Sequence, residues 1–354
     1  MGSMTRRYFM KMGVLTAATG AAAKVTSPFI ARAQSKEMVV CSWGGAYQEA
    51  QRKSMFDPFE KETGIKIIEA SPTDYGKLKA MVQSGNTEWD LVDVGDRMVI
   101  AGAKDGLLQP LDYKSIDTKD IYPQVIHPFG VGTIYYSSVL GYSTKKYPRG
   151  THPKSWAEFW DVGRFPAARC LRNNALDNLE FALMADGVPM DKIYPIDVDR
   201  AFRVMDRIKK HIKVWWTTGA QSAQVLADGE VDLVAAWNGR ITTIKNQGAP
   251  VDVEWNQGKL NWDSWVIPKG SRNKDGAMKF IAWAGTPKPQ ADITKYIPYG
   301  PVNKKAFDLI DAKTAAGLPT APENARRQLM VDTVYWGENL NALTERWNAW
   351  FIKG

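Results

Sequence analysis

The sequence predicts an α/β protein whose two halves repeat the same plan. Short apolar runs alternate with amphipathic segments from residue 37 onward, which is the pattern of strands and helices around a parallel sheet. The alternation starts again after residue 155, and two longer β-rich stretches at 127–143 and 251–268 follow the two repeats. These observations favour two α/β lobes connected by strands that cross between them.

The first lobe is expected to begin with a strand at 37–41 that ends in an open loop at Gly44-Gly45. A helix is expected at 46–62, and Gly64 stands where helices often end with a left-handed residue. The elements follow in βαβαβ order, which implies parallel strands with right-handed crossovers. The rest are a strand at 65–69, a helix at 75–84, a strand at 90–94, a helix at 97–105 and an extended connection at 107–111.

The second half follows the same plan. Paired strands are expected at 127–133 and 134–143, where the chain first crosses between lobes. Ser155 is a favourable N-cap for the next helix. The further elements are a helix at 155–160, strands at 168–172, 214–216, 231–237, 251–255 and 261–268, and helices at 176–186, 197–211, 220–228, 275–284, 287–296 and within 304–354.

A second crossing is expected at 262–265, and two crossings divide the chain into discontinuous lobes. Lobe 1 is expected to contain residues 36–141 and 265–306, and lobe 2 residues 142–264 and 307–354. Each lobe would be a mostly parallel sheet flanked by helices, with a cleft between the lobes.

The N-terminal segment has the features of an export signal. Thr5 to Lys11 resembles a twin-arginine consensus, a short apolar stretch follows at Met12 to Ala23, and Ala31-Arg32-Ala33 fits a small-x-small cleavage site. The apolar stretch is too short to span a bilayer stably. Residues 1–33 are therefore predicted to be a twin-arginine signal peptide directing the protein to the periplasm; a disordered basic tail is the alternative.

The net charge of +8 gives no support to nucleic-acid binding. Residues 1–33 carry five basic residues and no acidic ones, so 41 basic and 38 acidic residues remain in the rest of the chain, a net charge of +3. That part has no run of Lys and Arg with interleaved aromatic residues. A nucleic-acid partner is therefore not expected.

The sequence contains no recognisable catalytic motif. It has no nucleophile elbow, no HExxH, no Walker A loop and no GxGxxG after a strand. Its three histidines lie far apart in the sequence, so neither a His-rich metal site nor a cofactor is expected. Cys41 and Cys170 are predicted to be buried free thiols, with a single bridge as the alternative. Cys41 is a conceivable nucleophile, but no neighbouring residue explains its activation.

Many strands end in aromatic or charged residues. Two lobes that face each other would collect these ends in one cleft, where aromatic faces and carboxylates hold a cationic amine. Trp43 and Tyr47 could instead only pack their own turn. The candidate ligand-binding residues are Trp43, Tyr47, Asp96, Arg97, Asp177, Trp215, Trp237, Arg240, Trp262, Asp263 and Tyr299.

The sequence resembles the bacterial extracellular solute-binding proteins of ABC importers, in particular the spermidine/putrescine-binding branch. The resemblance covers residues 37 to about 303 and implies the two-lobed periplasmic-binding-protein fold, hinge closure on a ligand, an ABC permease as partner, a monomer and no chemistry. It is carried by the order and spacing of segments at 59–66, 90–92, 155–156, 228–231, 237–239, 263–268 and 299–303.

The resemblance also assigns roles to individual positions. Trp43 and Tyr47 match first-loop contacts, Asp177 and Asp263 match amine-binding acids, and Trp237 and Tyr299 match aromatic contacts. Gly95-Asp96-Arg97 departs from the polyamine pattern, because an arginine would repel a diamine but would pair with a carboxylate. The departure favours a short ω-amino acid such as 4-aminobutyrate.

Two arginines are candidates for the ligand carboxylate. Arg97 is the first, although it could instead cap its helix or pair with Asp93 or Asp96. Arg240 is the second, although it could face solvent. The alternatives for the function are a polyamine binder, a Cys-dependent periplasmic enzyme on the same fold, and a sugar binder that uses tryptophan platforms.

Overall fold

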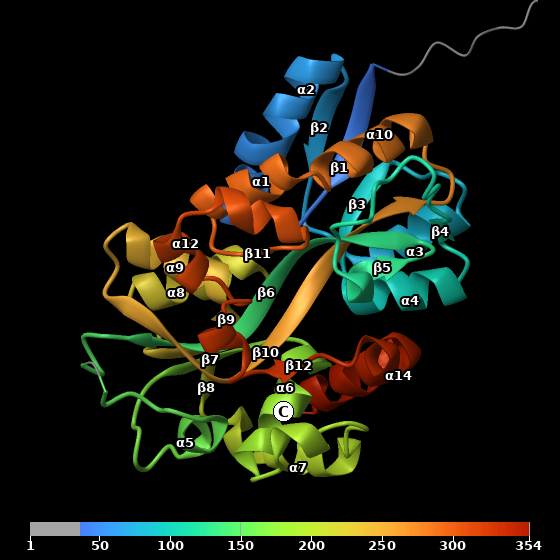
Figure 1. Ribbon diagram of the computed structural model, residues 1–354. Helices are drawn as coiled ribbons and strands as arrows, with labels where there is room; N and C mark the ends of the chain where they lie inside the picture. The colour runs from blue at the N-terminus through green and yellow to red at the C-terminus, as the bar shows by residue number, and fades with distance from the viewer. Residues whose placement is uncertain (1–35, 149, 354) are drawn as a thin grey trace, which may run out of the picture. The chain divides into compact units, whose positions relative to one another are not determined.

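The computed structural model describes residues 36–148 and 150–353. The predicted signal peptide at 1–33 lies outside these residues. Strands and helices alternate along the described chain as predicted (Figure 1). None of the described helices is both long enough and apolar enough to span a bilayer.

The strands lie close to their predicted positions. They are β1 (Glu37–Cys41), β2 (Lys66–Ala70), β3 (Leu91–Gly95), β4 (Leu108–Gln109), β5 (Ile126–His127), β6 (Gly130–Ser143), β7 (Arg169–Arg172), β8 (Ile212–Trp216), β9 (Leu233–Trp237), β10 (Val251–Pro268), β11 (Gly300–Pro301) and β12 (Leu329–Met330).

The helices follow the predicted order as well. They are α1 (Gly45–Gln51), α2 (Asp57–Thr63), α3 (Tyr75–Gln83), α4 (Asp96–Lys104), α5 (Trp156–Trp160), α6 (Ala175–Ala185), α7 (Val198–Lys209), α8 (Gly219–Ala227), α9 (Asn238–Asn246), α10 (Lys274–Ala284), α11 (Pro287–Asp292), α12 (Ala312–Ala316), α13 (Pro322–Ala325) and α14 (Thr333–Ile352). A π-helical turn, η1 (Arg52–Phe56), and short 3₁₀ turns, η2 (Pro123–Val125), η3 (Met190–Lys192), η4 (Ile293–Lys295) and η5 (Lys304–Leu309), complete the set.

The main strands form one sheet in the order β2-β1-β3-β10-β6-β9-β7-β8. The outer strands on each side are parallel to one another, β2-β1-β3 on one side and β9-β7-β8 on the other. The two central strands, β6 and β10, pair antiparallel with each other and with their outer neighbours. Two parallel α/β units are thus joined through a central antiparallel pair, in agreement with the predicted fold class.

The predicted pairs of strands at the two crossings are in fact two single long strands. Residues 130–143 form one strand, β6, which turns back onto the short β5 at Pro128-Phe129. Residues 251–268 likewise form one strand, β10, which stays continuous through an irregularity between Glu254 and Lys259. β10 pairs with β3 of the first unit, β6 pairs with β9 of the second unit, and the two long strands pair with each other along their length. This pairing explains why neither breaks at the crossing.

The long strands bring polar strand ends together. In the register of the sheet, Asp263 of β10 lies opposite Gly95 of β3 and Ile134 of β6. Trp237, the last residue of β9, lies opposite Ser138 of β6. The carboxyl ends of β3 and β9 therefore flank the middle of the β6–β10 pair, as expected for a ligand site in an α/β protein.

The first predicted helix is divided into α1, η1 and α2. Pro58 lies in the first turn of α2, where the missing backbone N–H is tolerated, and the wider η1 turn precedes it. Gly64 ends α2 in the left-handed conformation with φ +71°, which confirms the predicted termination.

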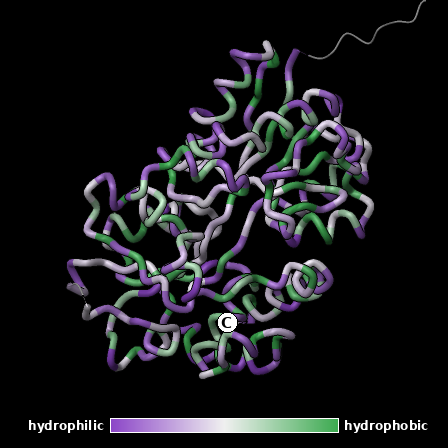
Figure 2. Tube along the Cα trace, viewed as in Figure 1, coloured by the Kyte–Doolittle hydropathy of each residue, from purple (hydrophilic) through white to green (hydrophobic). Residues whose placement is uncertain are grey.

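Amphipathic helices cover the sheet. In α7 the buried residues Ala201, Phe202, Met205 and Ile208 lie on one face, and Figure 2 shows hydrophobic and hydrophilic residues alternating along the peripheral helices. The C-terminal part is less helical than predicted, since it also contains β12, which pairs with β10. The long helix α14 packs against α4 and α6.

Candidate functional site

A small cavity lies where the strand ends converge. Its volume is about 10 Å³, which is room for roughly one water molecule. Six of its seven lining residues were predicted site residues; Tyr136 of β6 was not. The lining residues are Trp43, Tyr47, Tyr136, Trp237, Arg240, Asp263 and Tyr299. This inner cavity is therefore bounded by aromatic rings with one carboxylate and one guanidinium.

Asp263 supplies the carboxylate of the inner cavity. Its position on β10, opposite β3, buries the side chain. Among the described residues, Oδ1 of Asp263 has no hydrogen-bond partner. Burial raises the pKa of Asp263 well above its usual value, and the nearby charge of Asp93 raises it further. An unpartnered buried carboxylate is costly, so it marks a site where a cationic group would be stabilised.

Asp93 of β3 is the buried carboxylate beside Asp263. Its Oδ2 accepts hydrogen bonds from Tyr47 Oη (2.6 Å) and Gln51 Nε2 (2.8 Å), and its Oδ1 accepts one from Thr133 Oγ1 (3.2 Å). Burial raises the pKa of Asp93 to about 7, although these donors lower it. Because Asp93 has three donors and Asp263 Oδ1 has none, a proton held by the pair resides mainly on Asp263.

Arg240 supplies the guanidinium of the inner cavity. It lies in the first turn of α9, immediately after β9, and is buried. Its Nη2 donates to the carbonyl oxygen of Gly44 at 2.9 Å. Its Nε and Nη1 have no hydrogen-bond partner within the part of the chain that the structure describes. Two N–H donors of a rigid fork therefore remain for an acceptor such as a carboxylate.

The Gly44-Gly45 loop makes this arrangement possible. Gly45 has φ +57°, and a Cβ atom on it would lie 2.8 Å from Arg240 Nη1. Glycine has no side chain, so it allows another group to approach the backbone closely. The group that approaches here is the guanidinium of Arg240, so the first loop positions a charged side chain from the other half of the sheet.

Aromatic rings enclose the space around these two charged groups. Trp43 and Trp237 meet edge to face at 5.8 Å between ring centroids, and Tyr47 and Tyr299 meet at 5.3 Å. Tyr136 contacts both Trp237 and Tyr299. Aromatic faces around a carboxylate stabilise an ammonium group, and the nearby guanidinium adds a complementary site for an anion. The inner cavity thus suits a small molecule with a cationic and an anionic end.

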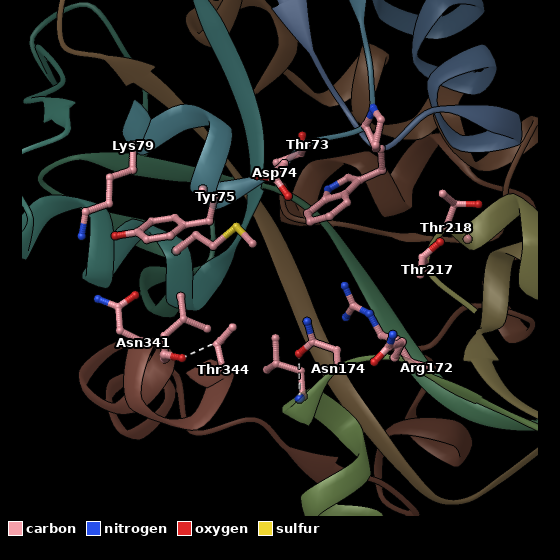
Figure 3. A pocket seen from close by; sticks show the side chains of 18 of the residues that line it. Thr73, Asp74, Tyr75, Lys79, Arg172, Asn174, Thr217, Thr218, Asn341 and Thr344 are labelled. Carbon is pink, nitrogen blue, oxygen red and sulfur yellow. Dashed lines mark hydrogen bonds between the residues drawn. The ribbon is translucent and has the colours of Figure 1, made fainter. Parts of the chain in front are cut away.

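A larger cavity of about 650 Å³ lies next to the inner one. Trp43 and Trp237 line both cavities and therefore stand between them. In Figure 3, Tyr75 and Lys79 lie across this outer cavity from Asn341 and Thr344, with Arg172 and Asn174 farther along it. The outer cavity provides a route along which a charged solute can approach the two tryptophans.

The structure places Arg97 and Asp96 outside both cavity linings. Arg97 Nη1 lies 3.0 Å from Asp96 Oδ1, and both side chains are buried. Burial alone would lower the pKa of Arg97, but Tyr136 and Asp96 raise it above its usual value. This pairing is one of the alternatives left open by the sequence, and it leaves Arg240 as the arginine that lines the inner cavity.

Asp177 also lies behind the cavity walls. Its Oδ1 is 2.8 Å from the ammonium of Lys259, and its Oδ2 is 3.8 Å from Arg172. Burial alone would raise the pKa of Asp177, but Lys259 and Arg172 lower it below its usual value. Asp177 thus already has a cationic partner from the chain itself.

Trp215 and Trp262 face away from the inner cavity. Trp215 packs against Trp347, Trp350 and Phe351 of α14. Its neighbour Trp216 contacts Trp237 instead, because side chains on a strand alternate between the two faces. The same alternation separates Trp262, which contacts Tyr135, from Asp263.

The two cysteines are free and buried. Burial raises the pKa of each thiol to about 12. The Cys41 thiol lies 3.8 Å from the hydroxyl of Thr73, and the other nearby groups include Asp93 and Asp74, whose charges disfavour a thiolate. Since the thiolate is the nucleophile, Cys41 lacks the environment that a cysteine-dependent enzyme requires.

Three important residues were not identified from the sequence, namely Asp93, Tyr136 and Lys259. Asp93 carried a usable signal, because a charged residue within an apolar strand needs a partner. Lys259 did not, since it lies in a polar stretch between the strands predicted at 251–255 and 261–268. Tyr136 carried none, since tyrosine is common in strands and its face depends on the strand's register.

Several known proteins resemble this chain over most of its length. A family model described as bacterial extracellular solute-binding protein matches residues 54–320. The chain is 38% identical to the gamma-aminobutyric acid-binding protein of Pseudomonas aeruginosa over 90% of this chain and 92% of the relative. More distant relatives, 27% identical in the case of Escherichia coli, are named spermidine/putrescine-binding periplasmic proteins and are aligned over 74% of this chain and 77% of the relative.

Solved structures match as well. An ABC transporter substrate-binding protein from Bradyrhizobium japonicum has a TM-score of 0.83 and 43% identity, covering 89% of this chain and 99% of its own. A structure named the Atu4243-GABA receptor has a TM-score of 0.80 and 41% identity, covering 89% and 97%. These matches confirm the predicted two-lobed binding-protein fold.

Proposed function

The chain belongs to the bacterial extracellular solute-binding proteins, and within this family we propose that it captures a short ω-amino acid such as 4-aminobutyrate. The observation that carries the proposal is the pair of unsatisfied charged groups in the inner cavity. Asp263 Oδ1 would accept the ligand ammonium, and Arg240 Nε and Nη1 would donate to the ligand carboxylate. The aromatic side chains around them would cover the methylene chain.

The similarity to a gamma-aminobutyric acid-binding protein and to a GABA receptor structure supports this ligand class. The local chemistry supports it independently. A diamine would place an ammonium beside Arg240, where two like charges repel each other in a poorly solvated cavity. A carboxylate there gains charge-assisted hydrogen bonds instead. Polyamine binding is therefore the second candidate, and Arg240 replaces Arg97 as the residue that argues against it.

A sugar ligand is favoured less by these residues. Tryptophan platforms would suit it, but a neutral sugar would leave the charges of Asp263 and Arg240 without ionic partners. A cysteine-dependent enzyme is not the function that the family and the buried thiols support.

Ligand entry would require the inner cavity to enlarge. A volume of about 10 Å³ is far too small for an amino acid, so Trp43 and Trp237 would have to separate. The predicted lobes, 36–141 with 265–306 and 142–264 with 307–354, would rotate about β6 and β10 and close again on the ligand. The Arg240–Gly44 contact joins the two halves and would open in this motion.

The proposed cellular context follows from the family and the N-terminal segment. Residues 1–33 would direct export to the periplasm through the twin-arginine route. There the protein would act as a monomer and deliver its ligand to an ABC permease in the inner membrane.

Calorimetric titration tests the proposed ligand class. We expect 4-aminobutyrate to bind with 1:1 stoichiometry, whereas butyrate and n-butylamine, which each carry one of its charged ends, should bind at least about 100-fold more weakly. Putrescine, which carries two ammonium groups, should also bind weakly. Tighter binding of putrescine than of 4-aminobutyrate would show that the site is a polyamine site.

A further inference from the structure

We propose that Lys259 is the chain's own occupant of an amine-binding pocket, and that it thereby restricts the ligand to a single ammonium group. The effect on ligand specificity rests on the proposed function, whereas the arrangement of residues around Lys259 does not depend on it. The pocket is formed by Asp177, Glu180 and Trp336, and we call it the lysine pocket.

The lysine pocket has the parts of an ammonium site. The buried Nζ of Lys259 lies 2.8 Å from Asp177 Oδ1 and 2.8 Å from Glu180 Oε1. It also lies 5.6 Å from the centroid of the Trp336 ring. Two carboxylates and an indole face are the groups with which proteins bind a free amine. Here they surround an amine that is covalently part of β10.

Neighbouring side chains fix the carboxylates of this pocket. Glu180 Oε1 also accepts hydrogen bonds from Trp336 Nε1 (2.6 Å) and Tyr194 Oη (2.8 Å). Asp177 has φ +71°, a left-handed conformation that is unusual for a residue other than glycine. A residue held in such a conformation indicates that its surroundings require that orientation. The pocket is therefore organised around a cation at the position of Lys259 Nζ.

The lysine pocket lies on the same side of β10 as the ligand site. The pairing with β6 is regular from Lys259 to Asp263, so these residues, four positions apart, point to the same face of the strand, roughly 13 Å from each other. Arg172, which lines the outer cavity, lies 3.8 Å from Asp177. The pocket thus sits directly behind the cavity wall.

The consequence concerns specificity. Acidic residues lie at two places along β10. The first is Asp263 at the inner cavity, and the second is the pair Asp177 and Glu180 of α6 at the lysine pocket. Lys259 neutralises Asp177 and Glu180, so only Asp263 is available to a ligand ammonium. A ligand with two ammonium groups would find one partner and would meet the positive charge of Arg240. Lys259 is accordingly a specificity-determining residue that discriminates against polyamines.

Replacement of Lys259 by alanine provides the test. Lys259→Ala removes three carbon atoms and the ammonium group, which together correspond to n-propylammonium. We expect 50 mM n-propylammonium to raise the Tm of this variant by about 5 °C or more, because it binds the folded state. Equal concentrations of n-propanol or NaCl should not. The variant should also bind putrescine at least about tenfold more tightly than the unaltered protein does, since two acids become available.

Lys245→Ala is the matched control, because Lys245 forms an exposed ion pair with Asp252 at 2.6 Å. The control and the unaltered protein should show a clearly smaller rise of Tm in n-propylammonium than Lys259→Ala does, since they offer the amine only the Asp263 site. If Lys259→Ala is recovered only as insoluble protein, expression and refolding with n-propylammonium should restore the native fold, whereas n-propanol should not. Absence of amine-specific rescue in both settings overturns the proposal.

The outcomes also separate this proposal from the proposed function. Failure of the unaltered protein to bind 4-aminobutyrate, with amine rescue of Lys259→Ala intact, would remove the ω-amino acid ligand but keep the lysine pocket. Binding of 4-aminobutyrate without any amine rescue of Lys259→Ala would keep the ω-amino acid ligand but remove the lysine pocket.

Discussion

The molecule contains two groups of buried charges that differ in how their charges are balanced. In the closed cluster, Lys259 lies between Asp177 and Glu180 at 2.8 Å from each. In the open pair, Asp263 and Arg240 border the inner cavity, and each has polar atoms without a partner among the described residues. Both groups are at least nine-tenths buried.

The difference shows which property of a buried charge indicates binding. Burial alone does not, since the closed cluster is buried as completely as the open pair. The closed cluster balances charge within the chain and contributes to a defined fold. Unpaired polar atoms occur in both groups, since Glu180 Oε2 of the closed cluster also has no hydrogen-bond partner among the described residues. Only those of the open pair line a cavity, where a ligand with complementary ends would offset their cost.

The largest expected effect concerns stability. Lys259→Met leaves two buried carboxylates without their cation, and we expect it to lower the free energy of unfolding by about 3–5 kcal/mol. Asp263→Asn replaces a buried carboxyl group that has no cationic partner and whose charged form is disfavoured by burial, so at pH 7.5 it should leave the stability unchanged or raise it. Urea denaturation of both variants measures this. Equal losses in the two variants would contradict the contrast.

The next effect concerns affinity. Arg240→Met removes the guanidinium proposed to hold the ligand carboxylate, and we expect 4-aminobutyrate binding to weaken by about 2–5 kcal/mol, which is roughly 30-fold or more. Arg97→Lys, which keeps a positive charge beside Asp96, is the control and should change affinity little. Calorimetry decides between them. If Arg97→Lys abolishes binding while Arg240→Met retains it, the ligand carboxylate lies at Arg97.

The pH dependence tests the protonation of the open pair. The pKa of Asp263 is raised by burial and by Asp93, so the ligand-free site holds a proton that a ligand ammonium would displace. Affinity for 4-aminobutyrate should therefore fall as the pH is lowered, by up to about tenfold per unit, and binding should release protons. Calorimetry in buffers of different ionisation enthalpy measures this release. A pH-independent affinity with no proton exchange would show that Asp263 is already ionised.

The same linkage applies to folding. The pKa of Asp93 rises from 3.8 to about 7 in the folded protein. The folded state therefore binds protons more tightly than the unfolded chain does between these values. This contribution to stability is fully present below pH 3.8 and is lost as the pH rises through 7. Asp93→Asn should flatten that dependence, because it removes the carboxyl group whose pKa burial raises.

The smallest expected effect is the difference in ligand affinity between substitutions of two tryptophans, Trp237 and Trp215. Trp237 borders both cavities, so Trp237→Leu should weaken 4-aminobutyrate binding by about tenfold through lost aromatic contact. Trp215 packs against α14, so Trp215→Phe should change the affinity by less than about twofold and lower the Tm only slightly. Fluorescence titration measures both. A larger loss for Trp215→Phe would place that ring in the site.

Most of the fold could be predicted from the sequence, because local residue patterns indicate where most strands and helices begin and end. Strands at 37–41 and 90–94 and the glycine that ends α2 follow from apolar patterning and turn chemistry. The continuity of β6 and β10 could not be predicted in this way, since it results from pairing with strands far apart in the sequence. The same pairing brings Asp263 and Trp237 to one place.

The sequence indicated which types of residue line the site, but it could not always indicate which side chain faces the inner cavity. Trp43, Tyr47 and Trp237 were identified because they lie at or shortly after the carboxyl ends of strands. Asp263 and Tyr299 were identified because they match contact positions of the family that the sequence resembles. Choosing between adjacent residues such as Trp215 and Trp216 requires the register of the strand. Choosing between Arg97 and Arg240 requires knowing that Asp96 already pairs with Arg97, which is a property of the packed structure.

The most direct test of the central claim is a crystal structure of the protein grown with 4-aminobutyrate. We expect the ligand in an enlarged inner cavity, with its ammonium within about 3.2 Å of Asp263 and its carboxylate within about 3.2 Å of Arg240 Nε or Nη1. Lys259 should remain between Asp177 and Glu180. A ligand bound in the reverse orientation, or held by Arg172 in the outer cavity with Asp263 and Arg240 still unpaired, would contradict it.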